Sequence, residues 1–214
     1  MKAPDFRTIN EHAFDVLSKR YVNKRGRLNS SSPLVQRFSQ LIGNFPNPVL
    51  LEIGVGSGFM LRYFSGKGVR TVGIDISYKM IEAAMRNSPY TEYIHDDFLS
   101  HEFTAGSFSG VFADAVLYLF PKDKIDQVFD KVYKILQRRG YFCLSVPVFD
   151  KPSQEVVKRG AGRSQILEYR VKYTLEEFIK ILYNSRFKVV RQSLTEFEDT
   201  QGGASIRLNN LLTK

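Results

Sequence analysis

The chain has 214 residues, of which 43% are hydrophobic and 25% charged, proportions typical of a globular protein with one full core. No apolar run approaches about 18 residues, the N-terminus has no continuous apolar segment, and the lone cysteine, Cys143, cannot form an internal disulfide. These features exclude a membrane span, a secretory signal and a disulfide framework, so we expect a reduced, cytoplasmic protein. The net charge of +9 permits an anionic substrate or a nucleic acid, and equally a solvated basic surface.

The first 48 residues predict two helices. Phe14 and Leu17 recur at helical spacing, and a basic, polar stretch follows them. The serines before Pro33 are typical helix starts, which favours a second helix over 34–45 that ends before the next prolines.

Strand and helix patterns alternate through the middle of the chain. We expect buried strands at 48–54, 69–76, 91–98, 107–120 and 141–148, with helices at 59–68, 77–87 and 121–140. Ser77 is the expected N-cap of the second of these helices. The third is amphipathic and is predicted to open at Pro121 and close at Gly140, with an apolar stripe formed by Ile125, Val128, Phe129, Val132, Ile135 and Leu136. Such alternation predicts an α/β fold with a doubly wound, mostly parallel sheet and helices on both faces.

The pattern changes after residue 148. Residues 149–165 are polar and basic without a clear period, and 166–173 reads as a strand. A helix is expected from Thr174, where Glu177 completes a capping box. The segments 187–197 and 205–214 read as two strands of an antiparallel hairpin.

The stretch LLEIGVGSGFM, residues 51–61, combines a buried strand with Glu52 and three glycines at alternate positions, Gly54, Gly56 and Gly58. At the carboxyl end of a strand in a doubly wound sheet, such a loop lets a ligand approach the backbone closely. A buried carboxylate at position 52 needs hydrogen-bond partners, from a ligand or from loop N–H groups. Asp75 ends the next strand, where a carboxylate can accept both hydroxyls of a ribose.

Glu-x-Gly-x-Gly-x-Gly, followed by acids after the second and third strands, resembles the class I S-adenosylmethionine (SAM)-dependent methyltransferases. The resemblance covers roughly residues 49–150 and implies a seven-stranded sheet whose last strand is antiparallel and inserted beside the fifth. It also implies SAM as cofactor, with Glu52 and the three glycines on its methionine half, Asp75 on the ribose and Ile76 against the adenine. Met80 is a further expected cofactor-binding residue. Asp97 would hold the adenine amino group and Phe98 would cover the ring, although Asp96 is an alternative to Asp97. Ala113 belongs to the implied set at the exit of the fourth strand.

The same resemblance bears on the acceptor side. Residues 14–21 resemble a family segment that folds over the cofactor, which makes Tyr21 a candidate lid residue. Many small-molecule members carry a histidine pair after the fourth strand, whereas this chain has Leu117, Tyr118 and Leu119. Tyr21, Tyr118 and His95 are the candidates for a general base, and for His95 a neutral, hydrogen-bonded loop residue is the favoured interpretation. No metal site is expected.

We expect a single domain over 1–214, with an N-terminal helical lid at 1–48, a cofactor-binding core at 49–150, and an acceptor-side segment with the C-terminal hairpin at 151–214. A small-molecule acceptor is the first choice. Arg163, Arg170 and Lys172 are candidates for binding a carboxylate or phosphate, or are solvated.

Other functions stay open. An RNA acceptor is the alternative, because 1–48 and 151–214 each carry a charge of +5 while 49–150 carries −1. Two further hypotheses are an NAD-binding oxidoreductase, disfavoured by the loop spacing and Glu52, and a non-catalytic SAM-binding or cofactor-free partner protein. The methylated atom, the oligomeric state and the pathway are not encoded in any motif of the sequence.

Overall fold

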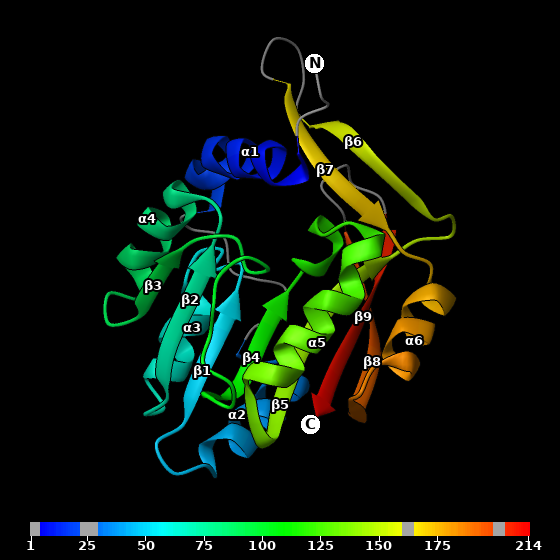
Figure 1. Cartoon of the computed structure of the whole chain (residues 1–214). Coiled ribbons are helices and arrows are strands. Elements are labelled where there is room, and N and C mark those ends of the chain that lie inside the picture. The colour runs from blue at the N-terminus through cyan, green and yellow to red at the C-terminus, as the bar shows by residue number, and fades with distance from the viewer. Residues whose placement is uncertain (1–4, 22–29, 160–164, 199–203) are drawn as a thin grey trace.

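The computed structural model describes residues 5–21, 30–159, 165–198 and 204–214 (Figure 1). Seven strands form one sheet in the order β3-β2-β1-β4-β5-β9-β8, in which β1 to β5 run parallel and β9 is antiparallel to both β5 and β8. The prediction of a doubly wound sheet with a C-terminal antiparallel hairpin is therefore confirmed. The strands are β1 (Val49–Ile53), β2 (Arg70–Asp75), β3 (Glu92–His95), β4 (Phe108–Asp114), β5 (Leu136–Val148), β8 (Lys188–Glu198) and β9 (Ala204–Thr213).

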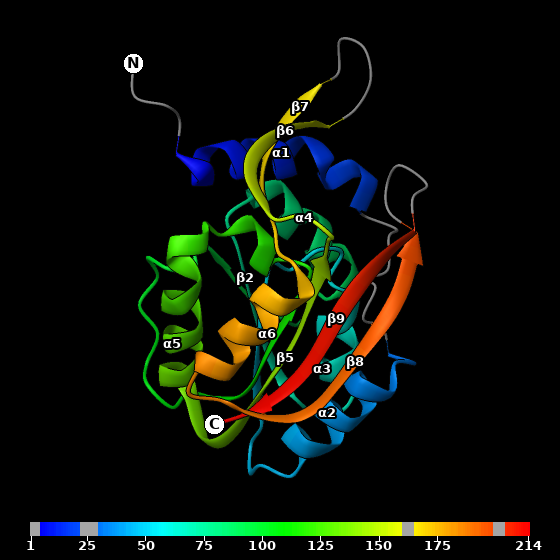
Figure 2. The same ribbon diagram turned by 90° about the vertical axis from the view of Figure 1, so that its right-hand side faces the viewer.

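Helices cover both faces of this sheet (Figures 1 and 2). One face packs against α2 (Pro33–Gly43), α3 (Phe59–Ser65) and α4 (Tyr78–Asn87), and the other packs against α5 (Ile125–Ile135) and α6 (Leu175–Asn184). Phe38 of α2 and Phe129 of α5 lie in the two separate apolar clusters, on opposite sides of the central strands. Because both faces are buried, β1 and β4 are apolar along nearly their whole length.

Two helix starts form as their sequences predict. Ser77 accepts a hydrogen bond from the Met80 backbone N–H at 3.1 Å and caps α4. Thr174 and Glu177 form a complete capping box at the start of α6, with hydrogen bonds of 3.0 and 3.1 Å. These caps fix the residues at which α4 and α6 begin.

The remaining elements lie at the edge of the sheet where the parallel strands end. The helix α1 (Phe6–Tyr21) lies across this edge, beside a separate two-stranded ribbon of β6 (Ser153–Arg159) and β7 (Ile166–Lys172) (Figures 1 and 2). Ile166 of β7 packs with Ala13 and Leu17 of α1. We call β6 and β7 the acceptor ribbon below, after the expectation that 151–214 forms the acceptor side.

Two predictions about secondary structure were wrong. The helix predicted to close at Gly140 ends at Ile135, and Leu136 pairs with Phe108 as the start of β5. Burial of the Leu136 side chain in the sheet core outweighs the helical pattern there, and Arg139 adopts the left-handed conformation with φ 62°. The stretch 149–165, expected to lack regular structure, contains β6.

Two further findings concern the whole chain. Cys143 is fully buried inside β5, and burial raises the pKa of its thiol well above the ordinary value. Among the described residues, none of the helices combines the length and the apolar character that a membrane crossing requires.

Candidate functional site

A cavity opens where the carboxyl ends of β1, β2 and β4 approach α1. This is the edge at which doubly wound sheets bind their ligands. Its lining is largely apolar, but it includes four carboxylate side chains and one guanidinium. The lining residues are Phe6, Arg7, Asn10, Phe14, Ile53, Gly54, Gly56, Ile74, Asp75, Ile76, Met80, Asp96, Asp97, Phe98, Asp114, Ala115, Val116, Leu119 and Phe120.

The three glycines after β1 all have positive φ, at 74°, 51° and 76°, but they do different work. Gly54 and Gly56 line the cavity, and a Cβ at Gly54 would lie 2.9 Å from the Val116 side chain. Gly58 lies outside the lining; it caps α3, and a Cβ there would lie 2.6 Å from the Ala84 carbonyl oxygen. The first two glycines therefore shape the cavity, and the third permits α3 to pack on α4.

Asp75 joins the glycine loop to the start of α4. Its Oδ2 accepts a hydrogen bond from the Val55 N–H at 3.0 Å, and its Oδ1 accepts one from the Ser77 N–H at 2.8 Å. Burial raises the pKa of Asp75 to about 6, although these two backbone hydrogen bonds oppose the rise. Each carboxylate oxygen has a second lone pair, so this side chain can also accept two ligand hydroxyls.

Glu52 is buried at the end of β1 and is not among the residues that line the cavity. The residue is 5% exposed, and its Oε2 has no hydrogen-bond partner among the described residues. Burial, together with the nearby charges of Asp114 and Asp75, raises the pKa of Glu52 well above the ordinary value. An orphaned acceptor in a cluster of three carboxyl groups is suited to a cationic ligand.

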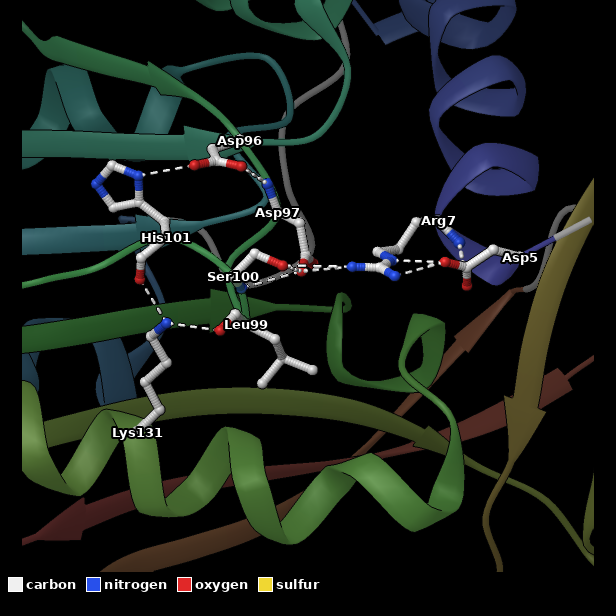
Figure 3. Close-up of polar contacts among 8 residues, drawn as sticks. All are labelled: Asp5, Arg7, Asp96, Asp97, Leu99, Ser100, His101 and Lys131. Atoms are coloured by element: carbon white, nitrogen blue, oxygen red, sulfur yellow. Dashed lines mark hydrogen bonds and ion pairs between the residues drawn. The ribbon is translucent and has the colours of Figure 1, made fainter.

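The segment after β3 forms a second polar wall (Figure 3). Asp97 Oδ2 accepts hydrogen bonds from the backbone N–H of Ser100 at 3.1 Å and from its hydroxyl at 2.8 Å. Asp96 accepts from the Asp97 N–H and from His101 Nδ1, at 2.8 and 2.9 Å. Both acids line the cavity, but the Asp97 side chain is 12% exposed against 45% for Asp96, while Phe98 is buried beside them. Desolvation makes Asp97 the stronger candidate for ligand recognition.

Two cations hold this wall from opposite sides (Figure 3). Lys131 of α5 donates hydrogen bonds to the carbonyl oxygens of Leu99 and His101, and its ammonium lies 5.4 Å from the centre of the Phe98 ring. Arg7 of α1 donates to the Ser100 hydroxyl at 3.3 Å and lies 3.7 Å from Asp97. The segment after β3 is thus held by both α5 and α1.

The exit of β4 contributes Asp114, which the sequence analysis did not single out. Its carboxylate accepts hydrogen bonds from the Ser145 hydroxyl and, at 2.7 Å, from the buried guanidinium of Arg207. Ala113, expected among the cofactor residues, is fully buried in the sheet core instead. Because side chains alternate along a strand, the acid that ends β4 faces the ligand edge while its neighbour faces the core.

Two of the candidate bases, His95 and Tyr118, are not among the residues that line the cavity. His95 Nε2 lies 3.0 Å from the Ile76 carbonyl oxygen, so this nitrogen carries the proton that it donates there. Tyr118 lies in a short helix at Leu117–Leu119, with the Arg170 guanidinium 5.8 Å from the centre of its ring. Tyr21 ends α1, and its side chain, like Arg163, falls outside the described residues.

Residues of α1 complete the site; the sequence analysis expected the segment 14–21 over the cofactor but did not single out Phe6 or Asn10. Phe6, Asn10 and Phe14 line the cavity. Asp15 accepts hydrogen bonds from the Ser77 hydroxyl at 2.6 Å and from the Lys79 N–H at 3.3 Å, which fastens α1 to the start of α4. No local motif marks Asn10, since its hydrogen-bond partners lie more than a hundred positions away in the chain.

Comparisons with known proteins agree with this architecture. Residues 50–140, somewhat less than half of the chain, match the model of a methyltransferase domain family. A protein of Geobacillus sp. (strain WCH70) assigned as a methyltransferase is 22% identical over 102 residues, which cover 45% of this chain and 41% of that protein. The match therefore spans well under two thirds of that relative's length.

Solved structures share the fold at low sequence identity. A SAM-dependent methyltransferase from Methanosarcina mazei superposes with a TM-score of 0.71 at 18% identity, covering 86% of this chain and 97% of that one. The magnesium protoporphyrin IX methyltransferase of Synechocystis PCC 6803, crystallised with SAM, superposes with a TM-score of 0.65 at 18% identity, covering 99% of each chain. Residues 50–140 therefore match a methyltransferase domain, and the chain as a whole shares the fold and strand order of these SAM-dependent methyltransferases.

Proposed function

We propose that this protein transfers a methyl group from SAM to a small-molecule acceptor that carries an anionic group. The observation that carries the cofactor assignment is the cavity at the sheet edge that Asp75 and two positive-φ glycines line, with the buried, orphaned Glu52 carboxyl on the strand that precedes the glycine loop. In this proposal 49–150 is the cofactor core, 1–48 supplies its lid, and 151–214 supplies the acceptor side.

The polar groups around the cavity fit the parts of SAM. Glu52 and the loop at Gly54 and Gly56 suit the amino-acid end, because a buried acceptor without a partner is stabilised by a cation. Asp75 suits the ribose, since both of its oxygens keep a lone pair beyond their backbone hydrogen bonds. Asp97 suits the adenine amino group, with Phe98, Ile76 and Met80 as the apolar surroundings of the ring.

Bound SAM supplies a reactive methyl group on a sulfonium, so the protein contributes mainly position and exclusion of water. Phe6 and Phe14 of α1 and Leu119 and Phe120 after β4 supply apolar walls on the α1 side of the cavity. Holding two reactants in a near-attack geometry can contribute on the order of 7–11 kcal/mol at its upper limit.

The candidate bases are assigned positioning roles in this proposal. The hydrogen bond from His95 to the Ile76 carbonyl holds the segment that follows Asp75. Tyr118 packs under Arg170 and would orient the acceptor. Tyr21 stays the candidate lid residue. A base is required only if the acceptor atom arrives protonated.

The charge of the acceptor ribbon supports an anionic acceptor. Glu168 is fully buried and accepts hydrogen bonds from Arg170 Nε at 2.6 Å and from Arg159 Nη1 at 2.9 Å. Glu168 thus fixes two guanidinium groups in a mostly buried cluster beside Tyr118. Guanidinium groups fixed in this way suit a carboxylate or phosphate on the acceptor.

The cofactor is tested by calorimetric titration with S-adenosylhomocysteine, with NAD as the parallel titrant. We expect binding in the micromolar range, roughly −8 kcal/mol, for the first and none for the second. NAD binding alone would assign the protein to the oxidoreductases, and binding of neither ligand would favour a non-catalytic partner protein.

The acceptor is tested with purified SAM and a panel of carboxylate, phosphate and neutral acceptors. Arg170→Gln should raise KM for the anionic acceptors and leave KM for neutral ones unchanged, while Lys180→Gln on the exposed side of α6 serves as the control. RNA is the alternative acceptor; its binding should weaken steeply as salt rises, with a slope of about −0.7 per phosphate contact for a single strand.

A further inference from the structure

Asn10 joins three segments of the chain above the cofactor cavity. It lies on α1, is 4% exposed and lines the cavity. Its Nδ2 donates a hydrogen bond to the Leu119 carbonyl oxygen at 3.3 Å, and its Oδ1 accepts one from the Tyr169 N–H at 2.9 Å. Leu119 follows β4 and Tyr169 lies in β7, so one amide side chain bridges partners 109 and 159 positions away.

The bridge ends on the acceptor ribbon. In β7, Tyr169 stands opposite Val156 of β6. Its ring also packs against Phe6 of α1, with the ring centres 5.7 Å apart. The hydrogen bond from the Tyr169 N–H to Asn10 therefore fixes the position of β7 relative to α1.

The same helix is tied to the cofactor side of the cavity. Arg7 contacts Ser100 and Asp97 in the wall after β3, and Asp15 contacts Ser77 and Lys79 at the start of α4 (Figure 3 for Arg7). A ligand that fills the cavity would therefore contact the face of α1 that carries Asn10, whose side chain binds the acceptor ribbon.

The chemistry of the amide makes Asn10 hard to replace. An asparagine side chain offers a donor and an acceptor side by side, and here each is matched to a backbone group of the opposite kind. Truncation removes both hydrogen bonds and leaves the Leu119 carbonyl and the Tyr169 N–H to find other partners in a partly buried region.

We propose that Asn10 is a positioning residue that couples the cofactor cavity to the acceptor ribbon, so that cofactor binding orders β7 and the segment at Leu117–Leu119. The coupling rests on the proposed function for the identity of the cofactor. By linkage it is reciprocal: an acceptor that orders the ribbon raises cofactor affinity by the same factor.

The test is residue-resolved amide hydrogen exchange of the full chain, with and without S-adenosylhomocysteine, in the wild type and in Asn10→Ala. In the wild type the ligand should slow exchange of the Tyr169 amide about fivefold or more, which corresponds to one net hydrogen bond. In Asn10→Ala the ligand should still bind, measured by calorimetry, and the Tyr169 amide should gain no protection.

Two further variants separate coupling from general loss of structure. Asn209→Ala removes another buried amide, which donates to Ser193 and Thr195 between β9 and β8, and should leave the ligand-induced protection intact. Asn10→Asp keeps an acceptor for the Tyr169 N–H and loses only the donor to the Leu119 carbonyl, so it should retain the ligand-induced protection of the Tyr169 amide.

The outcomes are distinct. Failure of the wild type to bind S-adenosylhomocysteine would overturn the proposed function and the coupling with it. Binding without protection of the Tyr169 amide, or equal protection in the wild type and Asn10→Ala, would overturn the coupling alone.

Discussion

Asp75→Asn is the substitution that tests the cofactor site most directly. The carboxylate accepts the Val55 and Ser77 N–H groups with one oxygen each, and in the proposed complex it accepts two ribose hydroxyls as well. An amide replaces one of these acceptors with a donor and removes the charge. Hydrogen bonds to a charged group contribute about 1.5–3 kcal/mol each, so loss of one should weaken S-adenosylhomocysteine binding between about tenfold and about 150-fold.

The pH dependence of binding gives the second arm of this test. Burial raises the pKa of Asp75 to about 6, with the charges of His95 and Asp15 as smaller influences of opposite sign. The ionised carboxylate is the form that accepts two hydroxyls. Wild-type affinity should therefore be constant above pH 7 and fall as pH drops through 6, to roughly a tenth of the plateau near pH 5. Asp75→Asn should lack this fall.

A matched control removes a carboxylate away from the cavity. Glu92 pairs with Arg70 on the surface of β3 at 2.8 Å, so Glu92→Gln should bind S-adenosylhomocysteine with wild-type affinity. Isothermal titration calorimetry at pH 5, 6, 7 and 8 covers all three proteins. Wild-type affinity that is flat over this range, or an Asp75→Asn variant with normal affinity at pH 8, would refute the assignment of Asp75 to the ribose.

Three further changes probe the surroundings of the site. The pKa of Glu52 is raised, so the folded protein holds the Glu52 proton more tightly than the unfolded chain does, and the free energy of unfolding declines as pH rises from about 5. In Glu52→Gln this decline should be absent when urea unfolding is measured at pH 5 and 8. The same variant should bind S-adenosylhomocysteine more weakly. Gly58→Ala should lower the free energy of unfolding by at least about 1 kcal/mol, because its Cβ would meet the Ala84 carbonyl at 2.6 Å and its φ is 76°; a fully stable variant would contradict this packing. Arg207→Met should cost about 3–5 kcal/mol by leaving Asp114 without its guanidinium partner, and adding Asp114→Asn should recover part of the loss in the double-mutant cycle.

The elements that depend on local signals could be predicted from the sequence. The apolar runs of β1 and β4 and the caps at Ser77 and Thr174 specify their own structure through burial and hydrogen bonds to near neighbours. The glycine loop and Asp75 could also be predicted, because a strand followed by alternate glycines is recognisable from consecutive residues. Among these residues, the need for a glycine at position 58 became clear only from the structure, because Ala84, which a Cβ at Gly58 would contact, is far away in sequence.

What the sequence could not supply depends on contacts between distant segments. In β6 no side chain is fully buried, so no alternation of apolar residues marks the strand, and its pairing with β7 is what makes it regular. Leu136 leaves the helical pattern because Phe108 offers a strand partner. Asn10 shows no motif at all, because its two partners are fixed only when the chain has folded.

The division between these two classes has a functional consequence. The domain match ends at residue 140, so it covers the cofactor loop and Asp75 but neither α1 nor the acceptor ribbon. The parts of the site that the match leaves out come from the two ends of the chain and meet through Asn10 above the cavity. A class of proteins that shares one donor and uses many acceptors can keep the core constant and vary the segments that enclose it. The chemistry of the acceptor must then be deduced from this chain's own flanking residues, of which Arg170, held by the buried Glu168, carries the clearest charge.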